Sequence, residues 1–177
     1  NSGTGGELVL SAGTTTAVGG AVGGHVLLKT GYSTETSSGD LQLMTTNAGV
    51  KGVSGLIVLS SGTSSYGNSG ALYLGSGSAV SGRGGAVYMT VGNGDTGSGG
   101  EIFISAGNTD AATMSGGQVS IFSGIGSQSS SGNIIVQTSN AGISGVSGYV
   151  VLSTGTTSLG PSGALYLGSG SAAGGNG

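Results

Sequence analysis

Apolar and polar positions alternate in short segments that recur along the whole chain. Each segment spans seven residues and reads x-aliphatic-x-aliphatic-x, then in most cases a small residue and glycine, usually after Gly-Gly or Ser-Gly. The alternation and the many β-branched side chains are typical of strands, whereas short runs and frequent glycines exclude helices. Eleven segments share the pattern: 7–13, 25–31, 40–46, 56–62, 71–77, 86–92, 101–107, 118–124, 133–139, 149–155 and 164–170.

The spacing of the segments defines two levels of repeat. The steps between the second residues of successive segments are 18, 15, 16, 15, 15, 15, 17, 15, 16 and 15 residues. Six such units form a super-repeat of about 93 residues, and "SGALYLGSGSA" accordingly stands at both 69–79 and 162–172. We therefore expect one continuous domain over 1–177, made of a super-repeat at 1–93 and an incomplete second one at 94–177.

A strand that returns about every 15 residues predicts an all-β fold, a single β-solenoid of about 11 stacked parallel coils. Each strand would pair with its equivalent in the next coil, about 4.8 Å away. Glycine would supply the corners, and the extra residues of the longer units would bulge out as loops. Positions 2, 4 and 6 of each segment are expected to face the interior, as two aliphatic ladders and one ladder of small side chains.

The energetics of one coil are unfavourable. Two buried aliphatic side chains contribute about 3–6 kcal/mol, whereas ordering the backbone of about 15 residues costs about 15–30 kcal/mol. Hydrogen bonding between many stacked coils would therefore have to supply the remaining stability.

Position 3 of each segment is expected to point outward, and it is apolar or aromatic in most segments. Either another part of the same chain covers this column, or the column forms an exposed apolar stripe that marks an interface. We interpret it as an interface for assembly of the chain with itself. The predicted interface residues are Val9, Leu27, Val58, Tyr73, Tyr88, Phe103, Ile135, Val151 and Tyr166.

Composition excludes several classes of partner. The chain has 43 glycines in 177 residues, 5% charged residues, no cysteine and a net charge of −3. Its only basic residues are Lys29, Lys51 and Arg83, so a basic footprint for nucleic acid is absent. No apolar run reaches the length of about 18 residues that a membrane span needs. The first residue, Asn1, follows neither an initiator methionine nor a signal peptide, so we expect a processed piece of a longer protein.

No motif indicates catalysis, a cofactor or a metal. "GNGDTG" at 92–97 matches a dinucleotide-binding spacing, but that reading requires a following helix. His25 is the only histidine, and Glu7 and Glu101 are equivalents one super-repeat apart, so a carboxylate pair within about 5–10 Å is not expected. Calcium-binding repeats need an Asp in each turn, and Asp is almost absent from the turns here, although one weak calcium site near Asp95 stays open. We expect a protein that is not an enzyme.

The pattern in "SGALYLGSG" and "GGELVLSAG" resembles that of Gly/Ser/Thr-rich tandem-repeat β-solenoid proteins of extracellular fibres and adhesins, over the whole chain. This resemblance implies an extracellular or cell-surface structural role, with the chain itself as its main partner and glycans as possible partners.

Two alternative functions stay open beside a structural filament. The first is adhesion to carbohydrate or another surface, and the second is ice binding. Ice binding is disfavoured because the outward column holds Tyr, Phe and Val in place of regular Thr. Six tyrosines could stack on sugars: Tyr32, Tyr66, Tyr73, Tyr88, Tyr149 and Tyr166.

Overall fold

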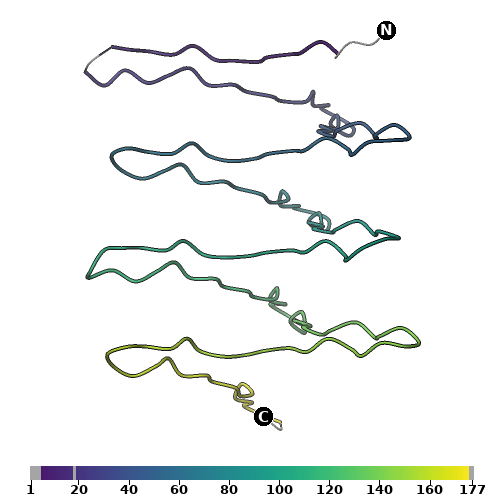
Figure 1. Ribbon diagram of the computed structural model, residues 1–177, viewed down its shortest axis with the longest axis vertical. Coiled ribbons are helices and arrows are strands. Elements are labelled where there is room, and N and C mark those ends of the chain that lie inside the picture. Colours follow the sequence, from purple (N-terminus) through teal and green to yellow (C-terminus); the bar gives the residue numbers. More distant parts are fainter. Residues whose placement is uncertain (1–4, 18, 176–177) are drawn as a thin grey trace. The chain divides into compact units, whose positions relative to one another are not determined.

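The computed structural model describes residues 5–17 and 19–175. Within these residues there is no helix and no β-strand, so the prediction of an all-β solenoid of paired coils is wrong. The chain falls into two units, Asn1–Met89 and Thr90–Gly177, and each is described by itself. In both units, extended stretches alternate with loops at which the chain doubles back (Figure 1).

Each extended stretch contains the seven residues from the glycine that immediately precedes a sequence segment to position 6 of that segment. We call these seven residues a limb and the first of them the neck glycine. All limbs have the same length by this definition, so the variation in repeat spacing falls in the loops between them. In the described part of the chain, the limbs are 6–12, 24–30, 39–45, 55–61, 70–76, 85–91, 100–106, 117–123, 132–138, 148–154 and 163–169.

The two ends of each loop lie close together, because position 6 of one limb contacts the neck glycine of the next. We call this contact a neck. An ideal Cβ atom placed on Gly55 would lie 3.0 Å from Cγ2 of Thr45, and one placed on Gly100 would lie 2.7 Å from Cγ1 of Val91. Glycine therefore stands at these necks because a side chain would displace the limb end. The same pairing occurs at ten loops: Ala12–Gly24, Thr30–Gly39, Thr45–Gly55, Ser61–Gly70, Ser76–Gly85, Val91–Gly100, Ala106–Gly117, Ser123–Gly132, Thr138–Gly148 and Thr154–Gly163.

Hydrogen bonds close seven of these necks in two ways. In the first, the neck amide donates to the carbonyl oxygen of the glycine that follows position 6: Gly24 to Gly13 (2.8 Å), Gly39 to Gly31 (3.0 Å), Gly117 to Gly107 (2.9 Å) and Gly132 to Gly124 (2.9 Å). In the second, the hydroxyl at position 6 donates to the neck carbonyl oxygen: Thr45 to Gly55 (3.3 Å), Thr138 to Gly148 (3.3 Å) and Ser76 to Gly85 (2.7 Å). The necks of the two units thus repeat the sequence super-repeat in their local geometry.

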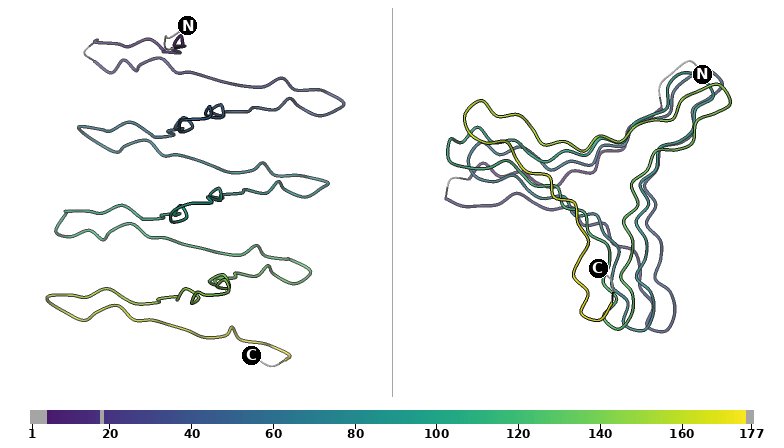
Figure 2. Two further views of the ribbon diagram at one scale, coloured as in Figure 1. Left: turned by 45° about the vertical axis from the view of Figure 1, so that its right-hand side comes forward. Right: turned by 90° about the horizontal axis from the view of Figure 1, so that it is seen from below.

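The loop tips require glycine at two equivalent positions. Gly67 has a φ of +96° and Gly160 a φ of +114°, a region that side chains with a Cβ atom rarely adopt. Just before each glycine, a hydroxyl donates to a backbone carbonyl oxygen, from Ser64 to Tyr66 (2.9 Å) and from Thr157 to Leu159 (3.3 Å). The narrow tips are visible in both views of Figure 2.

The predicted interior is also absent, because no described residue is buried. Position 2, which was expected to face inward, is 51–59% exposed in ten limbs and 84% exposed at Leu8, and position 4 is 57–78% exposed. The two aliphatic ladders are therefore not formed, since no paired neighbouring limb covers them. Position 6 lies at the loop necks and does not form a ladder along the chain.

Candidate self-association surface

The nine predicted interface residues all lie at the middle of limbs, at position 3. Their side chains are strongly exposed, from 68% at Val151 to 91% at Tyr73. Position 3 is in most limbs the most exposed of the aliphatic or aromatic positions, whereas position 2 is close to half exposed. This contrast agrees with the alternation of side chains along an extended chain. The assignment of these residues to an interface stays a prediction, because no partner chain is present.

Seven of these nine residues lie between two necks, whereas Val9 and Tyr166 belong to the terminal limbs, which have a neck at one end only. Val58, for example, lies in limb 55–61, which begins at the Thr45–Gly55 neck and ends at the Ser61–Gly70 neck. Every position 3 lies three residues from each end of its limb. The repeat therefore places an apolar side chain at the middle of nine of the eleven limbs; the other two carry Gln42 and Ser120 there.

The backbone of the limbs has no partner among the described residues. No amide at positions 1–6 of a limb donates a hydrogen bond, and no carbonyl oxygen at positions 1–5 accepts one. The limbs are therefore extended segments whose apolar side chains and main-chain groups both face solvent.

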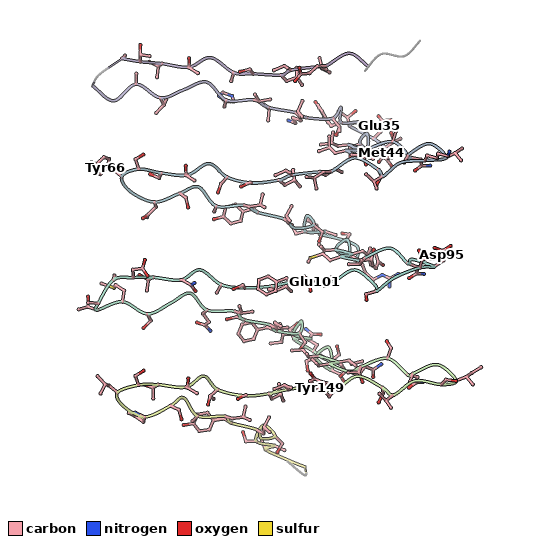
Figure 3. The ribbon with its side chains drawn as sticks, in the orientation of Figure 1. Glu35, Met44, Tyr66, Asp95, Glu101 and Tyr149 are labelled. Atoms are coloured by element: carbon pink, nitrogen blue, oxygen red, sulfur yellow. The ribbon has the colours of Figure 1, made fainter. Side chains whose placement is uncertain are left out.

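The acidic side chains and His25 are spread along the described part of the chain. The described residues enclose no pocket, and they contain no group of three or more His, Asp or Glu side chains that could hold a metal ion. Glu35 and Asp95 each lie in a loop, and Asp95 is at a loop tip (Figure 3). Glu7 and Glu101 belong to different units.

The tyrosines proposed for carbohydrate stacking lie on separate limbs and loops within each unit. Tyr73, Tyr88 and Tyr166 occupy position 3 of separate limbs, and Tyr149 occupies position 1 of another. Tyr66 stands at a loop tip with its side chain directed away from the chain (Figure 3). All six are exposed, from 80% at Tyr32 to 98% at Tyr66. No pocket in the described part of the chain joins two of them.

The neck pairs are the feature that sequence reasoning missed. The signal was present, because a glycine immediately precedes each of the eleven segments and lies six residues before position 6. The small residues at position 6 were expected to fill an interior, whereas their contacts are with the next neck glycine. A constant glycine-to-small spacing beside variable loop lengths would have indicated this contact.

Comparison with known proteins gives no relative, since no family model, curated protein or solved structure matches the chain. Within residues 5–17 and 19–175, the structure contains no helix of the length and apolarity needed to cross a membrane.

Proposed function

We propose that this chain is a structural module that assembles with copies of itself, through the apolar and aromatic residues at position 3 of its limbs. The observation that carries the proposal is the exposure of almost every large apolar side chain, in a sequence that is 35% hydrophobic. Such a surface is the usual mark of an interface. The proposed setting, taken from the sequence resemblance, is a filament at the cell surface or outside the cell.

The exposed surface area indicates how much contact with neighbouring copies the proposed assembly would require. The chain exposes 17843 Å², whereas a folded monomer of 16.4 kDa exposes about 7,500 Å² and its unfolded chain about 24,000 Å². The excess over a folded monomer is about 10,000 Å², against about 800 Å² that each partner buries in a standard interface. Contact with several neighbouring copies would account for such an excess, whereas a single pairwise contact would not.

The apolar character of position 3 favours burial of side chains, and not charge pairing, as the driving force of association. Only 5% of the residues are charged, so attraction between ions contributes little to association. Full burial of a large apolar side chain contributes about 1.5–3 kcal/mol, and nine such residues recur along each copy. The proposal involves no catalytic step, cofactor, nucleic acid or membrane insertion.

Light scattering from a concentration series of the full chain tests the proposal. The double variant Tyr73→Ser, Tyr166→Ser removes two aromatic rings from position 3 and is expected to raise the concentration of half-assembly at least about tenfold. The control is Tyr66→Ser, which removes a ring that is equally exposed but lies at a loop tip. Equal effects of the two variants, or scattering from monomers alone at every concentration, would overturn the proposal.

Measurements of glycan binding and of thermal hysteresis on the chain that stays monomeric would separate the alternatives. A chain that stays monomeric and binds soluble glycans would favour adhesion, and one that stays monomeric and shows thermal hysteresis would favour ice binding. No observation on the described residues singles out either of these functions, so both remain predictions from the sequence.

A further inference from the structure

The limbs carry main-chain groups that would be buried together with their side chains. Positions 1–5 of the limbs neither donate nor accept a backbone hydrogen bond within the described residues. The backbone–backbone bonds that do form lie at the necks or within loops, as between Met114 and Ala111 and between Gly145 and Gly142. Each limb therefore offers a row of free amide and carbonyl groups on either side of its apolar side chains.

Burial of the side chains at position 3 also buries the amide and carbonyl groups of the limb. This burial costs free energy unless those groups form hydrogen bonds. A side chain at position 3 is only three residues from either end of its limb, so a neighbour that covers it also removes water from the limb backbone. Each buried main-chain group without a partner costs about 1–3 kcal/mol, which is comparable to the gain from the apolar side chain itself. An assembly that buries the limbs must therefore supply hydrogen bonds to them.

The partner that fits this row is another limb of the same kind. All limbs have the same length and the same alternation, and segment 71–77 is identical in sequence to segment 164–170. Exposed extended edges are normally protected by proline or by charges. No limb contains proline, because Pro161 lies in a loop, and charged residues at the limbs are limited to a few at position 1 and Lys29 at position 5.

We infer that the limbs of one copy pair through main-chain hydrogen bonds with the limbs of a second copy of this chain. This inference rests on the proposed self-assembly and specifies its contact. The hydrogen bonds run between molecules, so they differ from the stacking within one chain that the structure excludes. The necks place limb ends at fixed spacings, and in this way they set the register in which two copies meet.

Hydrogen exchange with mass spectrometry tests the inference on the full chain, dilute and assembled. Assembly is expected to slow exchange of the limb amides at least about tenfold and to leave the loop amides unchanged. The test variant is Ala71→Pro, Ala164→Pro, which removes one amide donor from each of two limbs of identical sequence and leaves position 3 unchanged. Those amides donate no bond in the isolated chain, so the variant is expected to leave the monomer intact and to weaken assembly about three- to tenfold per lost bond.

The control variant is Asn68→Pro, which places proline in a loop at the position equivalent to Pro161 one super-repeat later. It is expected to assemble like the parent chain. Assembly with limb amides that still exchange freely, or with equal effects of the limb and loop prolines, would overturn main-chain pairing and leave the proposed self-association standing. Absence of any species larger than a monomer would overturn both.

Discussion

The hydroxyl of Thr45 donates a hydrogen bond to the carbonyl oxygen of Gly55 over 3.3 Å, and this bond closes the loop of nine residues at 46–54. Thr138 and Gly148 repeat the bond at the same distance in the second unit. A Cβ atom on Gly55 would lie 3.0 Å from Cγ2 of Thr45, and one on Gly148 would lie 3.3 Å from Cγ2 of Thr138. The pair thus combines a hydrogen bond with close contact, and it separates limb from loop.

Replacement of the hydroxyl at this neck is the first test. Thr45→Val keeps the branched shape but removes the donor to Gly55, and we expect the closed neck to lose about 0.5 kcal/mol, which lowers the ratio of closed to open necks about twofold. Nuclear Overhauser contacts between the γ methyl groups of residue 45 and the α protons of Gly55 in the dilute chain would report the loss. Thr46→Val is the control, and an equal loss of contact there would contradict the role of the hydrogen bond.

The second test adds a methyl group at the tightest neck and then shortens the side chain that faces it. Gly100→Ala would place a methyl group 2.7 Å from Cγ1 of Val91, so we expect the neck to open, at a cost of about 1–3 kcal/mol. Adding Val91→Ala should recover part of that cost, since alanine occupies the equivalent position at Ala12 and Ala106. A double-mutant cycle on the urea midpoint of the assembled material measures the coupling. Strictly additive effects would show that the two residues do not meet.

Backbone conformation at the loop tips gives a third test. Gly67→Ala forces a Cβ atom into a φ of +96°, and we expect a penalty of about 1–2 kcal/mol. Gly62→Ala is the matched control, because Gly62 has no positive φ and an added Cβ atom there would meet nothing within 4 Å. The urea midpoint of the assembled material should fall for the first variant only. An equal fall of the urea midpoint for both variants would contradict the claim that the positive φ of Gly67 requires glycine.

The sequence predicted the periodicity but not the way in which the segments associate. The alternation in 71–77 indicates an extended segment, and the structure contains one there. Alternation is a local property, however, and it does not determine whether the backbone of a neighbouring segment comes within hydrogen-bonding distance. The cost of ordering about 15 residues against two aliphatic side chains per unit indicates that a single coil lacks sufficient burial, and the sequence predicts that hydrogen bonding between stacked coils supplies the rest. The described residues do not form that stacking, and Leu72 and Leu74 remain 55% and 69% exposed.

The sequence predicts which residues repeat at position 3, but it does not predict the contacts that hold the limbs. Tyr73 and Tyr166 stand at the same position of identical segments, so the sequence places them on equivalent faces of equivalent limbs. The neck contact of Ser76 with Gly85 was not predicted, because it joins residues across a loop whose conformation is set by polar residues and glycine. Such contacts depend on backbone turns that the apolar pattern does not encode.

Dependence on salt gives a fourth test, which concerns the driving force of assembly. With 5% charged residues and a net charge of −3, association is expected to change little between low and moderate sodium chloride. Ammonium sulfate should strengthen it, because sulfate favours burial of apolar surface. Light scattering at fixed protein concentration measures both effects. Strong dissociation by sodium chloride would indicate that charge pairing drives association and would contradict the apolar mechanism.

Sedimentation velocity of the full chain across a wide concentration series tests the central claim most directly. The account predicts a slowly sedimenting monomer at low concentration, because 17843 Å² of surface faces solvent, and a shift to species of several copies as concentration rises. A single compact monomer at every concentration, with the friction of a folded protein of 16.4 kDa, would contradict it.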